Sequence, residues 1–199
     1  MSGTLEREAL LYRLVELGAR TTYVSEICGG ISTRRIRDAY TSHHGSQPPR
    51  GKVPNNAGWY AKDSKRNIQS SLLAARFKLM DLFSDSRGTQ QSNPSLLTVE
   101  GAHRFCDAYE DWKSKLGEQA EIDFTRGMVL LTSHLRTGQL SLKKCGDCSG
   151  SHLVLVYGSA GCPHCQERKT LENTRRAADV VVGTEKHEEQ QQHLLSVNG

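Results

Sequence analysis

Four cysteines near the C-terminal end constrain this chain more than any other feature. The segment CGDCSGSHLVLVYGSAGCPHC runs from Cys145 to Cys165 and holds two CxxC pairs separated by thirteen residues. Two residues between cysteines let both sulfur atoms of one turn reach the same ion, and a second such turn can complete a tetrahedral shell. We therefore interpret Cys145, Cys148, Cys162 and Cys165 as the ligands of one structural Zn²⁺ per chain.

Disulfide and redox roles for these thiols are the alternatives. The N-terminal stretch predicts an amphipathic helix and no signal peptide, and no apolar run approaches the roughly 20 residues of a membrane span, so we expect a cytoplasmic protein with reduced thiols. The sequence CPHC resembles the DsbA-type active site and keeps a thiol-disulfide oxidoreductase open. Only 34 residues follow Cys165, however, and no proline follows Pro163, so much of a thioredoxin-like fold would be missing.

Neighbouring residues refine the zinc interpretation. The glycines Gly146, Gly150 and Gly161 suit tight turns, and the charges of Lys143 and Lys144 offset those of the thiolates. We expect His152 and His164 to be exposed, and we expect Cys28 and Cys106, which fall on apolar helix faces, to lie in the core. A zinc ion held by four thiolates has no open coordination position, so the chain is not predicted to be an enzyme.

Apolar residues at helical spacing predict a mainly α fold for the rest of the chain. Expected helices cover residues 5–17, 22–28, 32–40, 68–83, 99–116 and 124–135, the last capped by Asp123. In the fourth of these we expect a core-facing stripe of Ile68, Leu72, Ala75, Leu79 and Phe83. The Pro- and Gly-rich segment 43–58 predicts a loop, and SDSRGTQQSNPS predicts a linker.

The predicted organisation has three parts. A helical body covers residues 1–142, a small zinc-binding module with four cysteine ligands covers 143–170, and a mostly disordered tail covers 171–199. Charge is distributed unevenly along these parts. Residues 20–78 hold eleven Lys and Arg against three acidic residues, whereas residues 81–123 hold four against nine. Basic surfaces attract phosphate backbones, so the basic segment is the candidate nucleic-acid surface and the acidic one a protein-facing or solvent face.

The stretch YVSEICGGISTRRIRDAY, within residues 22–40, has the layout of a helix-turn-helix. A short helix is followed by a Gly-Gly turn and by a second helix that Ser32 can cap. In such motifs the second helix enters the major groove of DNA. Ile36 and Tyr40 lie on one face of this helix. The basic residues on other faces and in the following segment are candidate DNA contacts: Arg34, Arg35, Arg37, Arg50, Lys52, Lys62, Lys65 and Arg66.

Several motifs together resemble the FlhC family. They are LVELGAR, GGISTRRIRDAYTSHHGSQPPRGKVP, GWY and the paired CxxC, in this order, and the resemblance covers about residues 5 to 170. It implies a mostly helical DNA-binding subunit of the bacterial flagellar master transcriptional activator, with zinc on the four cysteines. Basic residues near those cysteines become further candidate DNA contacts: Lys143, Lys144, Arg168 and Lys169.

The resemblance also implies partners. FlhC-type chains act with FlhD in a heterohexamer of two FlhC and four FlhD chains, bind double-stranded promoter DNA of flagellar operons, and activate transcription with σ⁷⁰-type RNA polymerase. We expect the basic helix, its flank and the zinc module to form one DNA-facing surface, and the helical body to bind the partner. A zinc protein that binds RNA is a further alternative, since basic charge and four cysteines would serve it equally well.

Overall fold

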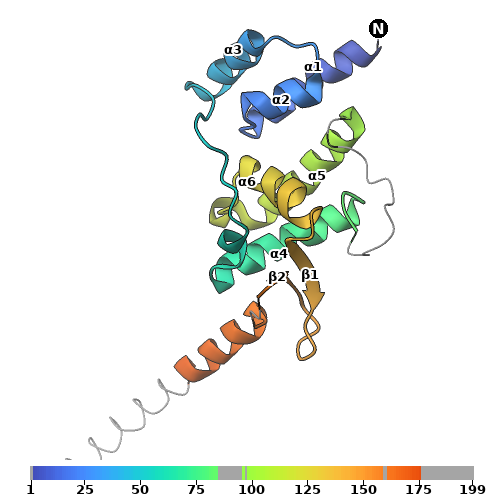
Figure 1. Ribbon diagram of the computed structural model, residues 1–199. Helices are drawn as coiled ribbons and strands as arrows, with labels where there is room; N and C mark the ends of the chain where they lie inside the picture. The colour runs from blue at the N-terminus through green and yellow to red at the C-terminus, as the bar shows by residue number, and fades with distance from the viewer. Residues whose placement is uncertain (1, 85–95, 97, 159–160, 176–199) are drawn as a thin grey trace, which may run out of the picture.

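The computed structural model describes residues 2–84, 96, 98–158 and 161–175. The molecule is elongated, with α1, α2 and α3 at one end, α4, α5 and α6 in the middle, and a β-hairpin at the other end (Figure 1). The N-terminal elements are α1 (Ser2–Glu16), α2 (Thr21–Cys28) and α3 (Thr33–His44). The central elements are η1 (Ala57–Ala61), α4 (Ser64–Leu79), α5 (Val99–Leu116), η2 (Gly117–Gln119), α6 (Phe124–Val129) and η3 (Leu130–Leu135). The hairpin pairs β1 (Leu140–Lys144) with β2 (Ser151–Leu155), and residues 163–175 form a final helical segment.

The short helix, Gly-Gly turn and second helix expected within residues 22–40 are present as α2 and α3. Gly29 and Gly30 separate α2 from α3 with φ values of 48° and 73°, which favour glycine. The Ser32 hydroxyl then accepts a hydrogen bond from the N–H of Arg35 and caps α3. Ile36 and Tyr40 are buried as expected, so the arginines of α3 lie on its exposed faces.

The centre of the molecule is an aromatic core built on α4, α5 and α6. Phe105 stacks on Phe77 at 5.1 Å between ring centroids and meets Phe124 edge-on at 5.2 Å. Trp112, also from α5, is 2% exposed and donates its indole N–H to the carbonyl of Gln69. The predicted apolar face of α5 is therefore confirmed, and Asp123 caps α6 by accepting from the N–H of Arg126.

The predicted core stripe of α4 is wrong except for Phe83, which follows the helix and is buried. Leu72 and Leu79 are 47% and 71% exposed, and the buried face instead includes the polar residues Asn67, Ser70 and Ser71. Asn67 donates its amide to the carbonyl of Leu153 on β2, and the N–H of Leu153 donates to the Ser71 hydroxyl. These bonds satisfy the backbone of a buried strand, which leucines could not do. The apolar periodicity was therefore misleading, because the polar residues of α4 bind the hairpin.

Two other elements differ from the expectation. The helix predicted over 124–135 is α-helical only to Val129 and continues as the π-helical turn η3. The strand β1 was not predicted, and it pairs antiparallel with β2 from Leu140↔Leu155 to Lys144↔Ser151. Leu140 and Leu153 are 1% and 0% exposed, so the root of the hairpin lies in the main core.

The predicted fold class, mainly α with a small C-terminal cysteine module, is confirmed. No helix among the described residues is long and apolar enough to cross a membrane. Most of the predicted linker, residues 85–95, and most of the predicted tail, residues 176–199, lie outside the described residues; residues 171–175 are helical.

Candidate metal centre and nucleic-acid interface

The four predicted ligands meet at the tip of the β-hairpin. The sulfur atoms of Cys145, Cys148, Cys162 and Cys165 all lie within 4.8 Å of one another, and none forms a disulfide. Cys145 and Cys148 lie in the turn between β1 and β2. Cys162 directly precedes the helical segment 163–175 (orange, Figure 1), and Cys165 lies in its first turn. Within the thirteen residues between the pairs, β2 leads from the tip to the root of the hairpin, so the second pair meets the first only after the chain has left the tip.

The sulfur geometry fits a tetrahedral zinc ion. Two measured separations are 3.8 Å, between Cys145 Sγ and Cys165 Sγ, and 3.6 Å, between Cys148 Sγ and Cys162 Sγ. Zinc–sulfur bonds of about 2.3 Å place tetrahedral sulfur ligands roughly 3.8 Å apart. The two contacts join the CxxC pairs crosswise, whereas a redox CxxC would pair its own two sulfurs. The donor set and its spacing thus fit a structural metal.

Local backbone structure prepares the site. The N–H of Cys145 donates to the carbonyl of Gly150, and the N–H of Ser149 donates to the carbonyl of Cys145, so the first CxxC is a closed turn. Ser149 has φ of 58°, whereas none of the three flanking glycines has a positive φ. Gly150 leaves room for its neighbours instead, because an added Cβ would lie 3.3 Å from Cys148 Sγ and from the His164 ring, closer than an ordinary van der Waals contact.

Charge at the site favours a cation. Hydrogen bonds from backbone N–H groups, that of Cys148 foremost, lower the pKa of the Cys145 thiol to about 7. The pKa of the Cys165 thiol is raised to about 12, chiefly by its hydrogen bond to Cys148. Several thiolates this close repel one another, and a divalent ion removes that repulsion and deprotonates them all. When bound, zinc would supply a rigid cross-link here and no chemistry.

The histidines depart from the expectation. His152 lies on β2, is only 7% exposed, and its Nδ1 is buried without a hydrogen-bond partner among the described residues. His164 is half-buried. Neither belongs to the described cluster of possible metal ligands. Cys28 and Cys106 are fully buried as predicted, and burial raises the pKa of their thiols to about 11 and about 12.

The arginines of α3 differ in their surroundings. Arg35 forms an ion pair with Glu8 of α1 at 2.6 Å, and Arg34 lies 3.8 Å from Asp38 on its own helix. Arg37 donates its Nε–H to the carbonyl of Thr33 but has no carboxylate partner among the described residues. Of the three predicted contacts on α3, Arg37 is thus the least neutralised.

Comparison with known proteins identifies the family. The profile of the family described as flagellar transcriptional activator (FlhC) matches residues 6–177. The chain belongs to the FlhC family. A relative from Cupriavidus necator, named Flagellar transcriptional regulator FlhC, is 27% identical over 153 residues, which are 75% of this chain and 68% of the relative. The predicted resemblance is confirmed, and the residues matched by the family profile include both α3 and the four cysteines.

The predicted DNA contacts of this FlhC-family chain do not form one surface. Arg34, Arg35 and Arg37 lie on α3 at one end of the molecule, and Lys143 and Lys144 lie on β1 at the other (Figure 1). Arg168 and Lys169 lie on the segment 163–175, also at the hairpin end. Arg50 and Lys52 are exposed in the connection between α3 and η1.

Lys65 and Arg66 are less available than their sequence context suggests. Both pair with Glu121, at 2.6 Å and 3.2 Å. The Arg66 guanidinium also lies over the Trp59 ring, which Arg126 approaches as well, at 4.0 Å from the ring centroid. Lys65 is therefore neutralised by Glu121, whereas Arg66 links Glu121 to the Trp59 ring of the GWY segment.

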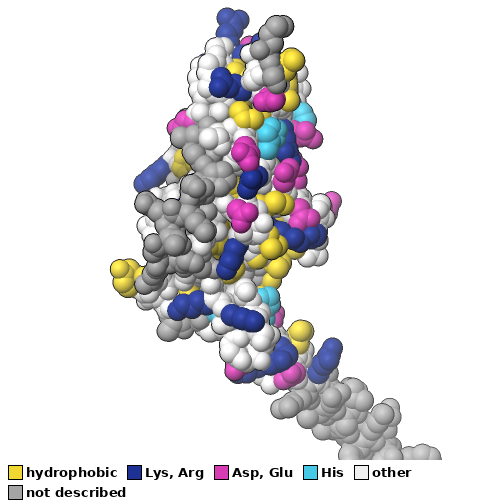
Figure 2. All heavy atoms as spheres, turned by 90° about the vertical axis from the view of Figure 1, so that its right-hand side faces the viewer, with side chains coloured by type: hydrophobic (Ala, Val, Ile, Leu, Met, Phe, Trp, Pro, Cys, Tyr) yellow, Lys and Arg dark blue, Asp and Glu magenta, His cyan; other side chains and the backbone are white. Residues whose placement is uncertain are grey.

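The acidic region of the FlhC-family chain is also largely neutralised from within. Figure 2 shows acidic and basic side chains intermingled along the flank that carries α5. Arg13 of α1 contacts Asp107 at 2.5 Å and Glu110 at 2.6 Å, and Arg76 of α4 contacts Asp111 at 2.8 Å. The hydrogen bond to Glu110 is the main reason that the pKa of Arg13 is raised. Sequence reasoning missed Arg13, because its partners lie more than 90 residues away.

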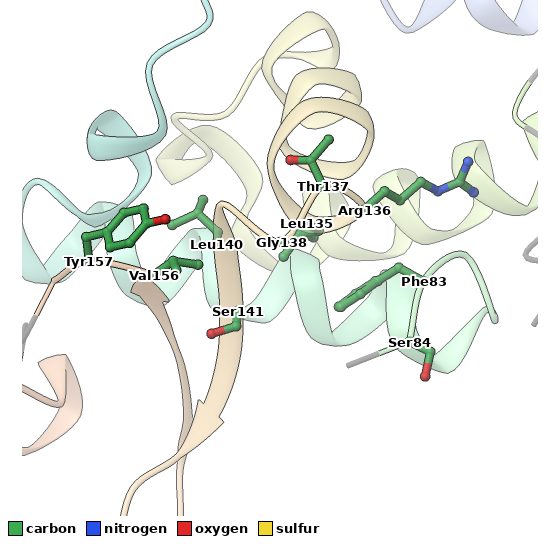
Figure 3. Close-up of a pocket in the computed structure, with 10 residues that line it drawn as sticks. All are labelled: Phe83, Ser84, Leu135, Arg136, Thr137, Gly138, Leu140, Ser141, Val156 and Tyr157. Carbon is green, nitrogen blue, oxygen red and sulfur yellow. The ribbon is translucent and has the colours of Figure 1, made fainter. Parts of the chain in front are cut away.

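A hollow of about 450 Å³ lies between the end of α4, η3 and the root of the hairpin. Leu140, Val156 and Tyr157 line one end of it, and Phe83 and Ser84 line the other (Figure 3). None of the described residues that line it is Asp, Glu, His or Cys. The described lining residues therefore provide no carboxylate, imidazole or thiol for acid–base chemistry, nucleophilic attack or metal binding.

Proposed function

We propose that this chain is the DNA-binding subunit of a transcription activator that acts with an FlhD-type subunit. The activator binds promoter DNA of flagellar operons in the bacterial cytoplasm and recruits or activates σ⁷⁰-type RNA polymerase. Family membership supports a role as a flagellar transcriptional regulator. The observation that carries DNA binding is the α2–turn–α3 arrangement, in which only Ile36 and Tyr40 of α3 are buried and its basic faces are open.

The zinc ion is structural in this proposal, and the chain is not an enzyme. Four thiolates fill the tetrahedral shell and leave no position for a substrate or a water molecule. The hairpin tip then forms a rigid second basic region with Lys143, Lys144, Arg168 and Lys169. This region and α3 lie at opposite ends of the molecule. Either one chain contacts two separate segments of a promoter, or the two regions that contact neighbouring DNA belong to different copies of the chain in the complex.

The exposed apolar residues of α4 are the proposed contact with the FlhD-type subunit. Leu72 and Leu79 lie seven residues apart, so they share one face of α4. Ile68, one turn before Leu72, and Ala75, between the two leucines, are only partly buried. Such a stripe suits an apolar helix face of a partner. The acidic face of α5 is a weaker candidate, because its carboxylates are already paired within the chain.

Co-expression with an FlhD-type subunit tests these proposals. Size-exclusion chromatography with light scattering should find a stable complex, expected to hold two copies of this chain and four of the partner. The complex should bind a flagellar promoter duplex more tightly than a scrambled duplex or a structured RNA, and should raise promoter-specific transcription by σ⁷⁰ RNA polymerase. Equal affinity for the three nucleic acids would reject sequence-specific DNA binding, and preference for the RNA would favour the RNA-binding alternative.

Surface variants test the partner contact in the same assay. Leu72→Ser and Leu79→Ser should weaken the complex while leaving the melting temperature of the separate chain nearly unchanged, because both side chains are exposed. Leu171→Ser is the matched control, since Leu171 is 59% exposed on the segment 163–175. Normal assembly of both α4 variants would remove this face from the interface.

A further inference from the structure

A cavity of about 310 Å³ lies where the start of α2, the outer face of α3 and the Pro-Gly loop meet. Three arginines from these three segments line it: Arg20, Arg37 and Arg50. The remaining lining residues are Thr21, Thr22, Pro48, Pro49, Gly51 and Val53. No acidic residue is among them. We call this site the arginine cavity.

Hydrogen-bond donors without an acceptor lie at the start of α2, whose first residues line the arginine cavity. Thr21 and Thr22 begin α2, and its first intrahelical bond is donated by Val24 to the carbonyl of Arg20, so the N–H groups of the first turn have no acceptor within the helix. The residue before this turn, Arg20, provides no side-chain cap. Its Nε is buried and has no hydrogen-bond partner among the described residues.

Arg20 also holds the loop in place. Its Nη1 donates to the carbonyl of Gly51 at 2.8 Å, which brings the loop that carries Arg50 against the start of α2. Gly51 has φ of 94°, a conformation that favours glycine and turns the loop at this point. The loop is therefore positioned so that Arg50 and Arg37, which are distant in sequence, line the same cavity.

The arginine cavity differs from the surface beside it. Arg34 and Arg35 have carboxylate neighbours in Asp38 and Glu8, whereas Arg20, Arg37 and Arg50 form no ion pair among the described residues. Three uncompensated guanidinium groups and a helix N-terminus make a strongly anion-attracting site. Their many N–H donors suit an anion with several acceptor oxygen atoms, such as a phosphodiester.

We propose that the arginine cavity binds a backbone phosphate of duplex DNA, with Arg20, Arg37 and Arg50 around it. This inference rests on the proposed DNA-binding function and assigns the residues that fix the register of the protein on the duplex. The location agrees with the general geometry of helix-turn-helix motifs, in which the first helix meets the DNA backbone while the second reads bases. The contact contributes affinity and carries no base specificity.

The test is promoter binding as a function of salt, with the full chain in complex with its FlhD-type subunit. Fluorescence anisotropy with a promoter duplex and with a scrambled duplex gives the slope of log K against log salt. Arg37→Ala and Arg50→Ala should each make that negative slope shallower by about one. Each should also weaken binding to the two duplexes equally. Between about 50 and 200 mM salt, the ratio of wild-type to variant affinity should then shrink about fourfold.

Controls separate this inference from folding defects and from the parent proposal. Arg104→Ala, on α5 and away from the cavity, removes an arginine paired with Glu100 and should leave the slope unchanged. Arg37→Lys and Arg50→Lys should keep most of the slope because they keep the charge. If the wild-type complex binds the promoter but Arg37→Ala and Arg50→Ala keep its slope, the arginine cavity is not a phosphate site. An equal loss of slope in Arg104→Ala would also overturn it, because the effect would then follow from any removed positive charge. A wild-type complex that binds no DNA refutes the proposed function itself.

Discussion

Replacement of Cys148 by Ser tests both the metal centre and its attachment to the helical body. Cys148 Sγ lies 3.6 Å from Cys162 Sγ, at the centre of the crosswise contacts that join the two CxxC pairs. Structural zinc contributes about 10–16 kcal/mol in small zinc modules, so one thiolate of four accounts for about 3 kcal/mol. We expect zinc affinity to fall roughly 100-fold.

The structure also predicts where the protein loosens. The hairpin tip and the segment 163–175 are joined by the four sulfurs, whereas the root of the hairpin is held by Leu153, which is fully buried and bonds through its backbone to Asn67 and Ser71. Loss of the metal should therefore expose the tip and leave the root in place.

Metal analysis and hydrogen exchange measure these two effects. The wild-type chain should hold one zinc ion, and its cobalt derivative should have the spectrum of a four-sulfur tetrahedral site. In Cys148→Ser, the amides of Cys145, Ser149 and Gln166, which are bonded within the tip, should lose protection, and the amide of Leu153 should keep it. Cys28→Ala is the control, since Cys28 lies in the core and its replacement should leave zinc content unchanged.

Two results would refute this reasoning. Wild-type protein that is pure, folded and free of zinc would show that the cysteines are not a metal site. Loss of protection at Leu153 to the same extent as at the tip would show that the metal holds the whole hairpin, and that the hydrogen bonds to α4 contribute little.

Two other predictions concern the helical body. Arg13→Ala removes the contacts of α1 with Asp107 and Glu110 and should lower the free energy of unfolding, measured by urea denaturation, by about 1 kcal/mol, because these groups are partly exposed. Arg104→Ala removes an exposed pair with Glu100 and should change that free energy by less than about 0.5 kcal/mol. Burial raises the pKa of the Cys106 thiol to about 12, so as pH rises the thiol ionises in the unfolded chain before it does in the folded one. The contribution of this thiol to the free energy of unfolding is therefore present below about pH 8.5 and is lost as pH rises toward 12. The loss is about 2 kcal/mol at pH 10. The urea midpoint should therefore fall less between about pH 8 and pH 10 in Cys106→Ala than in the wild type, and an identical fall in both would contradict this origin.

Local features of the sequence were sufficient to predict several parts of the structure. The CxxC pairs, the Gly29–Gly30 turn and the caps at Ser32 and Asp123 all depend on hydrogen bonds or ligand geometry within a few residues. The burial of Cys28 and Cys106 followed from apolar helix faces whose periodicity was clear. Such features can be predicted from a sequence because the residues that interact are only a few positions apart along the chain.

The buried face of α4 and the availability of each arginine were decided only in three dimensions. Asn67 and Ser71 are buried because β2, more than 80 residues away, needs partners for its backbone groups. Arg35 is neutralised by Glu8 and Lys65 by Glu121, while Arg20 and Arg50, which carry the same charge, meet at a cavity without acids. A set of basic residues specifies total charge, but the field at each position depends on which side chains the fold brings within a few ångströms.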